Sequence, residues 1–127
     1  MAVSGARWPV AYTLPPDVVD RLNKFKATLT DEISEIDQIV ELAAQGAEPL
    51  EIATAIADLL GDVVVYCRSE ALKYGLPLEG VLEIIMDSNE SKLDESANPI
   101  YDINGKFLKG PNYWAPEHRI RTLLAEL

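Results

Sequence analysis

Two long stretches of this chain repeat apolar residues at the spacing of one helix face. The first runs from about Pro16 to Gln45, and its apolar positions are Leu22, Phe25, Leu29, Ile33, Ile36 and Val40. The second runs from Pro49 to Gly75, and its apolar positions are Ile52, Ile56, Leu59, Leu60, Val63, Cys67 and Tyr74. Intervals of three and four residues indicate amphipathic α-helices, and Gly46 and Gly75 are typical residues at helix ends. Two helices of this length predict an all-α fold.

The rest of the chain after Gly75 predicts shorter elements. A third helix is expected from near Pro77 to Leu93, and Pro116 is a suitable start for a short C-terminal helix. Between them, Asn104-Gly105 is the strongest short signal for a hairpin turn. We expect a single domain over residues 1–127, with a helical core at about 17–93 and a hairpin-like tail at 94–127. Because the helices carry apolar residues on several sides, we expect a helical bundle that oligomerisation completes.

Composition and charge exclude several classes of protein. The chain has 127 residues, of which 48% are hydrophobic, which is not a disordered composition. A net charge of -10 argues against broad contact with nucleic acid. No apolar run approaches the roughly 20 residues that span a bilayer, and the start lacks the features of a signal peptide. With one cysteine, Cys67, no internal disulfide forms. We therefore expect a cytoplasmic protein that binds neither nucleic acid nor membrane.

Acidic residues at one-turn spacing occur within both long helices. Glu32 and Glu35 follow Asp31 in the first helix, and Asp58 and Asp62 lie in the second. Residues three or four apart share a helix face, so each helix presents a pair of like charges in one direction. If the pairs face each other, a hard cation such as Mg²⁺ or Mn²⁺ between them would relieve the repulsion. The alternative is that these acids belong to a solvated face.

Neighbouring residues favour the metal interpretation over the solvated face. The flank of the first helix that carries Glu32 also carries Ile39 and Leu42, so it lies beside a packing surface. Neither acidic pair has a Lys or Arg placed to form an ordinary ion pair within its helix. Glu51 shares the row of Asp58 and Asp62, whereas Asp31 points furthest from the apolar stripe. The sequence alone leaves open whether Glu51 or Asp31 joins the site.

Several motifs together resemble those of a known family. The segments "DEISE", "DLLGDVVVY", "ALKYGLPL" and "SNESKL", with the closing "NPIYDINGKFLKGPNYWAP", resemble the MazG-like superfamily of all-α nucleotide pyrophosphohydrolases. The resemblance covers about residues 20–112 and is closest to small single-domain members from phages and bacteria. Glu32 and Glu35 match the Glu-x-x-Glu half of the family motif. Asp62 matches the aspartate of the second half, and Asp58 or Glu51 completes it, with Asp58 preferred. Glu90 stands where the family commonly has Met.

The resemblance implies an activity and a set of roles. It implies hydrolysis of a nucleoside triphosphate to the monophosphate and pyrophosphate, with Mg²⁺ or Mn²⁺ held by Glu32, Glu35, Asp58 and Asp62. Glu35 would act as the general base. The substrate-binding residues would be Asn89, Lys92 and Lys109.

The family also suggests substrate, assembly and location. Small phage members include one that produces dGMP from dGTP, so dGTP or GTP is the preferred substrate. A homodimer or homotetramer is expected, in the cytoplasm of a bacterium or of a phage-infected cell. Two alternatives stay open: a non-catalytic helical protein-interaction module, and a phosphoribosyl-ATP pyrophosphohydrolase.

Overall fold

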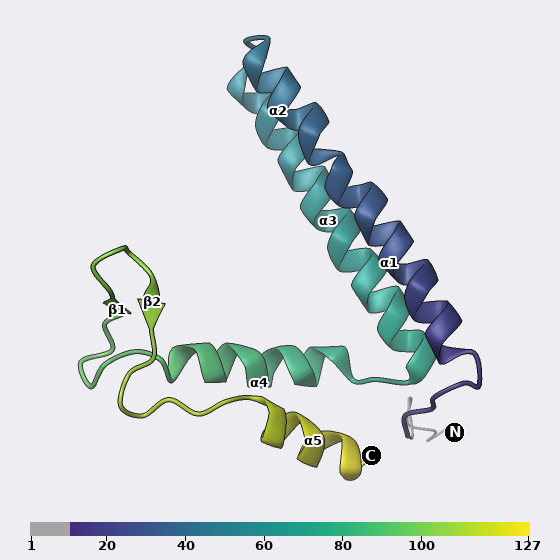
Figure 1. The fold of residues 1–127 in the computed structure, drawn as a ribbon, viewed down its shortest axis with the longest axis vertical. Helices are drawn as coiled ribbons and strands as arrows, with labels where there is room; N and C mark the ends of the chain where they lie inside the picture. Colours follow the sequence, from purple (N-terminus) through teal and green to yellow (C-terminus); the bar gives the residue numbers. More distant parts are fainter. Residues whose placement is uncertain (1–10) are drawn as a thin grey trace. The chain divides into compact units, whose positions relative to one another are not determined.

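The computed structural model describes residues 11–127, which are mainly helical (Figure 1). The described residues divide into two compact units, Thr13–Tyr74 and Gly75–Leu127, the second of which also includes Ala11 and Tyr12. The expected all-α fold is confirmed, with one small two-stranded sheet. The single-domain expectation stays a prediction, and each unit is described by itself.

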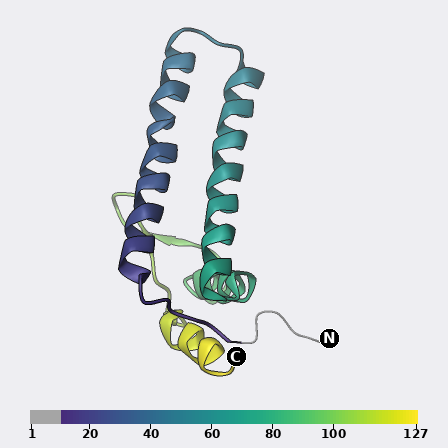
Figure 2. The same cartoon turned by 90° about the vertical axis from the view of Figure 1, so that its right-hand side faces the viewer.

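The unit Thr13–Tyr74 is a helical hairpin. It consists of α1 (Val18–Ser34), α2 (Ile36–Ala44) and α3 (Pro49–Tyr74), and α3 packs along both α1 and α2. Figure 2 shows the two arms of the hairpin side by side, joined by the turn after α2. Gly46 and Gly75 follow α2 and α3 with φ of +78° and +65°, the left-handed conformation expected at helix ends. The predicted helix ends are therefore confirmed.

The first predicted helix is interrupted at Glu35, which separates α1 from α2. Here the Glu35 N–H donates to the Glu32 carbonyl at 3.0 Å, a bond across three residues in place of the usual four. Just before the break, the hydroxyls of Thr30 and Ser34 donate to carbonyls four residues back, at 2.7 and 2.8 Å. Such bonds compete with the helix ladder and bend it. The break therefore falls within the Glu-x-x-Glu pair.

A polar cluster lies at the C-terminal end of α3. Glu70 is only 7% exposed, and its carboxylate accepts hydrogen bonds from the Tyr74 hydroxyl at 2.7 Å and from Lys73 Nζ at 3.1 Å. The Thr13 N–H donates to the Tyr74 carbonyl at 2.8 Å and ties the incoming chain to the end of α3. Because both carboxylate oxygens of Glu70 are paired, its burial is compensated.

The second unit consists of α4 (Leu78–Glu90), β1 (Ile100–Tyr101), β2 (Phe107–Leu108) and α5 (Glu117–Ala125). Helices α4 and α5 pack together, closely enough that a Cβ on Gly80 would lie 3.2 Å from Leu123 Cδ2. Ser88, 2% exposed, donates its hydroxyl to the Trp114 carbonyl at 2.8 Å and anchors the segment before α5. The expected third helix and C-terminal helix are both present.

Two turns of the second unit repeat one hydrogen-bonding pattern. In each, an aspartate Oδ1 accepts the N–H groups two and four residues later: Asp94 from Ser96 and Asn98, and Asp102 from Asn104 and Lys106, all at 2.8–2.9 Å. The second turn joins β1 to β2, which pair antiparallel in the register Ile100↔Leu108 and Tyr101↔Phe107. The hairpin predicted from Asn104-Gly105 is therefore confirmed.

The fourth residue of each turn has a positive φ, +63° at Ala97 and +81° at Gly105. An L-residue in this conformation places its Cβ near the following carbonyl oxygen, at a cost of about 1–2 kcal/mol that glycine avoids. The same backbone conformation is therefore strained at Ala97 in the first turn and unstrained at Gly105 in the second.

Substituting the two positions should move stability in opposite directions. We expect Gly105→Ala to lower the free energy of unfolding by about 1 kcal/mol and Ala97→Gly to raise it. Denaturant unfolding of each variant measures the change. Gly61→Ala serves as the comparison: Gly61 lies within α3 and a Cβ there would meet no atom within 4 Å, so alanine at this helical position should raise the free energy of unfolding. A gain of stability in Gly105→Ala would contradict the prediction.

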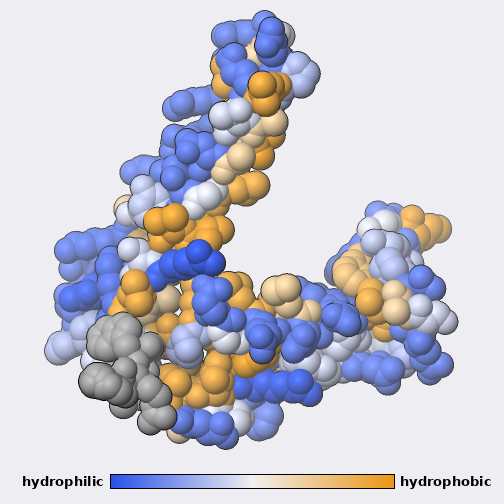
Figure 3. All heavy atoms as spheres, turned by 180° about the vertical axis from the view of Figure 1, so that it is seen from behind, coloured by the Kyte–Doolittle hydropathy of each residue, from blue (hydrophilic) through white to orange (hydrophobic). Residues whose placement is uncertain are grey.

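Apolar residues cover much of the outer surface of the helical hairpin. The exposed ones include Leu22, Ile33, Ile36, Val40, Ile56, Leu60, Val64 and Val65. Figure 3 shows that orange, hydrophobic residues lie along one side of the helices on the face in view. Ile56 and Leu60, which the sequence placed on the core side of the second helix, are 43% and 59% exposed in the single chain. No helix among residues 11–127 is both long and apolar enough to cross a membrane.

Candidate functional site

The four predicted carboxylates line one pocket inside the helical hairpin. The pocket has a volume of about 120 Å³ and is lined by Glu32, Glu35, Gln38, Ile39, Leu42, Ala55, Asp58, Leu59 and Asp62. The first five of these residues come from the end of α1, the break and α2, and the other four come from α3. Neither Asp31 nor Glu51 is among them. The packing of α3 against α1 and α2 therefore brings both acidic pairs to one place.

Apolar side chains line the pocket beside the acids. Ile39, Leu42 and Leu59 are half-buried between the helices and form part of the pocket wall. Glu35, Asp58 and Asp62 are exposed, whereas Glu32 is half-buried. The acids thus lie at the solvent-exposed edge of the apolar contact between the two arms, which we call the apolar seam. This agrees with the expectation that Glu32 lies beside a packing surface.

Glu32 is the most constrained of the four carboxylates. Its Oε2 atom is buried and has no hydrogen-bond partner within residues 11–127. Burial is the main cause that raises the pKa of Glu32 above its ordinary value, and interaction with Glu35 and then with Asp62 raises it further. Tyr66 acts in the opposite direction, through a hydrogen bond that favours the ionised form. An unpartnered carboxylate oxygen beside other carboxylates is a site that a cation would stabilise.

The donor chemistry of the pocket fits a hard divalent cation. Among the described residues that line the pocket, none is a Lys, Arg or His. Carboxylate oxygens are the ligands that Mg²⁺ and Mn²⁺ prefer. Across residues 11–127, however, no three His, Cys, Asp or Glu side chains converge closely enough to hold a metal ion. The residues therefore fit the ion by type and location, and binding requires their side chains to move together.

The predicted substrate-binding residues all belong to the second unit. Asn89 lies exposed in the last turn of α4. The ammonium groups of Lys92 and Lys109 lie over the rings of Phe107 and Tyr113, 5.6 and 4.9 Å from the ring centroids. Because this unit is described separately from the helical hairpin, the part of these three residues in the site stays a prediction.

The structure adds two side chains that sequence reasoning missed. Gln38 lines the pocket three residues after Glu35, and Tyr66 interacts with Glu32 from four residues after Asp62. Both positions are one helical turn from a predicted acid, so a search of the neighbouring turns would have found them.

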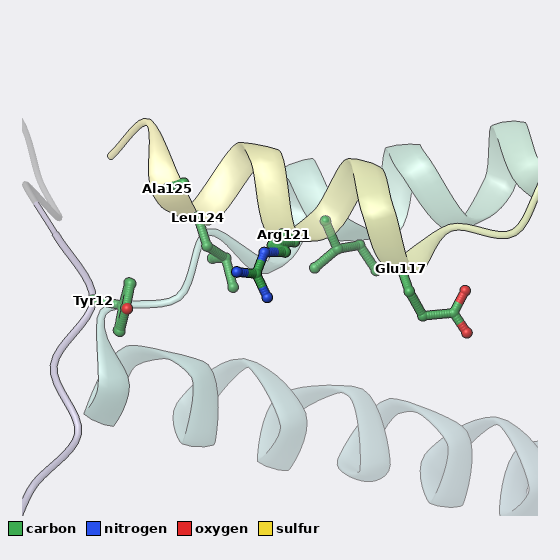
Figure 4. Close-up of a pocket in the computed structure, with 6 residues that line it drawn as sticks. Tyr12, Glu117, Arg121, Leu124 and Ala125 are labelled. Atoms are coloured by element: carbon green, nitrogen blue, oxygen red, sulfur yellow. The ribbon is translucent and has the colours of Figure 1, made fainter.

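A larger pocket lies in the second unit, on one face of α5. Its volume is about 490 Å³, and its lining is Tyr12, Glu117, Ile120, Arg121, Leu124 and Ala125 (Figure 4). The lining is mostly apolar and includes none of the predicted site residues. Size alone therefore does not identify the candidate site, and we assign that role to the smaller acidic pocket.

Comparison with known proteins shows the fold. The chain resembles the solved structure of a proposed NTP pyrophosphohydrolase from Exiguobacterium sp. 255-15, with a TM-score of 0.55 and 16% sequence identity. The match covers 96% of this chain and 86% of the other. No protein-family model matches the chain, and no similar sequence was found among curated proteins.

The pKa of Glu32 should depend on its acidic neighbours. In metal-free protein we expect Glu35→Gln to lower this pKa, and Asp62→Asn to lower it by less, because Glu35 exerts the larger effect. Titration of the Glu32 carboxyl by NMR measures both changes. An unchanged pKa in Glu35→Gln would contradict the proposed contact.

The same shift fixes the direction of the pH effect on stability. Since the pKa of Glu32 is higher in the folded chain than in the unfolded chain, folding favours the protonated form. Its contribution to stability is complete below the ordinary glutamate pKa and disappears as the pH rises through the raised value. A bound cation would oppose this trend, because it requires ionised carboxylates.

Proposed function

We propose that this protein is a metal-dependent nucleoside triphosphate pyrophosphohydrolase. The single observation that carries the proposal is the pocket that four carboxylate residues from two helical arms line, with no Lys, Arg or His among its described lining residues. Like charges held together in this way favour a divalent cation as their partner. The fold likeness to a proposed NTP pyrophosphohydrolase supports the same conclusion.

Each acidic residue has a role in the proposed reaction. Glu32, Glu35, Asp58 and Asp62 would hold Mg²⁺ or Mn²⁺. The ion, when bound, supplies charge neutralisation of the triphosphate and a water of lowered pKa. Glu35 is exposed and lies at the break between α1 and α2, so its carboxylate is free to accept a proton from the attacking water. The water attacks the α-phosphorus, the α–β phosphoanhydride bond breaks, and pyrophosphate leaves.

Asn89, Lys92 and Lys109 would bind the substrate, as the family resemblance implies. Lys92 and Lys109 each carry an ammonium group that can meet phosphate oxygens, and Asn89 offers an amide for the ribose or the base. Both ammonium groups lie over aromatic rings, which restricts their motion. For the substrate we propose a purine triphosphate, with dGTP or GTP preferred on the family resemblance alone.

A homo-oligomer, a dimer or a tetramer, is part of the proposal. The helical hairpin exposes a row of large apolar residues along its length, among them Val40, Leu60 and Val64. An apolar row of this extent is unfavourable in water and is characteristic of an interaction surface. A second copy of the chain would cover it by pairing helices.

Pyrophosphate release should depend on the pocket acids. We expect hydrolysis of at least one canonical NTP or dNTP in the presence of Mg²⁺ or Mn²⁺, and a loss of more than about 100-fold in kcat in Glu35→Gln and in Asp62→Asn. The assay is a panel of all canonical NTPs and dNTPs, together with phosphoribosyl-ATP, with pyrophosphate detection.

Glu51→Gln is the matched control, because Glu51 lies on α3 but outside the pocket lining. Its activity should equal that of the unaltered chain. Hydrolysis of phosphoribosyl-ATP alone would favour that alternative. Full activity in both pocket variants, or no hydrolysis of any substrate, would reject the proposal and favour a non-catalytic interaction module.

Assembly should depend on the exposed apolar row. We expect Leu60→Lys and Val64→Lys to shift the protein towards the monomer, because each places a charge where apolar surfaces would meet. Light scattering coupled to size-exclusion chromatography measures the mass. Asn23→Lys, a polar position of α1, is the control. A monomeric unaltered chain would contradict the proposal.

A further inference from the structure

Gly110 lies so close to the backbone after α4 that no side chain fits at its position. A Cβ there would lie 2.5 Å from the carbonyl oxygen of Leu93 and 2.7 Å from that of Lys92. Both are backbone atoms, so a side chain could be accommodated only if the chain itself moved. The φ of Gly110 lies outside the left-handed region. Glycine is therefore needed here for the close approach of two backbone segments and not for a special conformation.

Hydrogen bonds of Gly110 join the two segments that carry the predicted substrate-binding lysines. The Gly110 N–H donates to the Lys92 carbonyl at 2.8 Å, and the Gly110 carbonyl accepts from the Tyr113 N–H at 3.3 Å. Lys109 immediately precedes Gly110 in the chain. The contact therefore makes the backbones of Lys92 and Lys109 neighbours, although 16 residues separate Lys92 from Lys109 in the sequence.

Both lysines contact aromatic rings of the segment that Gly110 fixes. The Lys92 ammonium lies 5.6 Å from the ring centroid of Phe107, and the Lys109 ammonium lies 4.9 Å from that of Tyr113. Phe107 comes three residues before Gly110 and Tyr113 comes three residues after it. Two cations on neighbouring backbone segments suit an anion with several charged oxygens, such as a polyphosphate.

A second set of bonds fixes the segment that follows Gly110. The Ser88 hydroxyl donates to the Trp114 carbonyl at 2.8 Å, and the Ser91 hydroxyl oxygen accepts from the Trp114 N–H at 3.2 Å. Because these bonds hold the segment to the end of α4, it cannot slide freely away from Lys92. A side chain at Gly110 would therefore displace Lys92 and Lys109 relative to each other.

We propose that Gly110 is a positioning residue that holds Lys92 and Lys109 as one pair of cations for a polyphosphate chain. This inference rests on the proposed function, which assigns the two lysines to the substrate. It adds the residue that sets the separation of the two lysines without touching the substrate.

Gly110→Ala tests the inference, because it adds one methyl group where two carbonyl oxygens leave no room. We expect KM for the nucleotide to rise about tenfold or more, the effect of losing a hydrogen bond to a charged group. We expect kcat to change little, because the lysines would bind the phosphates equally in the ground state and in the transition state. Steady-state kinetics measures both constants. Calorimetric titration with inorganic tripolyphosphate and Mg²⁺ should show a loss of affinity of similar size.

Gly105→Ala is the matched control, because it also replaces a glycine of the second unit by alanine. Gly105 has a positive φ, and a Cβ there would meet no atom within 4 Å. This variant should lower stability and leave KM and the affinity for tripolyphosphate unchanged. An equal rise of KM in both variants would show that lost stability alone explains the effect, and it would overturn the inference.

A double-mutant cycle shows whether Gly110 acts through the lysines. Lys92→Met and Lys109→Met remove the ammonium groups and keep the backbone. In the chain with both methionines, adding Gly110→Ala should raise KM little further. A further rise equal to that in the unaltered chain would overturn the inference.

The lysine variants also decide the question if Gly110→Ala does not fold. In chains that keep Gly110, two lysines that act as one pair should show losses of tripolyphosphate affinity that are not additive. Additive losses in Lys92→Met, Lys109→Met and the double variant would overturn the pairing.

The outcomes distinguish the inference from the proposed function. An unaltered chain that releases pyrophosphate, with an unchanged KM in Gly110→Ala, overturns the role of Gly110 and leaves the proposed function standing. An unaltered chain that hydrolyses no nucleotide but binds tripolyphosphate, more weakly in Gly110→Ala, overturns the proposed function and supports the lysine pair. A chain that neither hydrolyses nucleotides nor binds tripolyphosphate overturns both.

Discussion

The packing of α3 against α1 and α2 is the interaction on which the candidate site depends. The same contact buries the apolar seam of the hairpin and gathers the acids of both arms at its edge. The free energy gained by burying Ile39, Leu42 and Leu59 offsets the repulsion between the carboxylates that come with them. Neither acidic pair could form the pocket alone, because each comes from only one arm.

The break at Glu35 gives this arrangement its local freedom. A continuous α-helix would fix Glu32 and Glu35 at the usual angular offset of residues three apart. Glu35 lies between α1 and α2, where its backbone N–H and carbonyl each take part in a hydrogen bond that spans three residues, and its side chain is exposed. Glu32 is half-buried between the two arms, whereas Glu35 is exposed.

Apolar periodicity predicted most of the fold because burial in this chain follows helical spacing. The ends of the long helices, the hairpin at Asn104-Gly105 and the helix after Pro116 all have local causes, and the structure contains each of them. The break at Glu35 was missed, because the apolar stripe continues through it. The hydroxyls of Thr30 and Ser34, which bond to the backbone just before the break, are not part of an apolar pattern.

The site was predictable in part. Spacing placed Glu32 with Glu35 and Asp58 with Asp62, but it could not choose between Asp58 and Glu51, since both lie on one row of the second helix. The packing of α2 against α3 decides which of them reaches the pocket. Tyr66 was not predictable from an acidic motif, because its contribution depends on the approach of Glu32 from the other arm.

The two aspartate turns show that some acidic residues of this chain have a structural role. One oxygen of Asp94 and one of Asp102 each accept hydrogen bonds from two backbone N–H groups. Both carboxylate oxygens of Glu70 accept hydrogen bonds, one from Tyr74 and the other from Lys73. These carboxylates stabilise the fold through hydrogen bonds within the chain. The formal net charge of -10 includes these carboxylates as well as the pocket acids. The number of carboxylates that are available to bind a cation is therefore smaller than the net charge suggests. A cation can bind this protein where carboxylate oxygens have no hydrogen-bond partner, and the net charge does not show where that is.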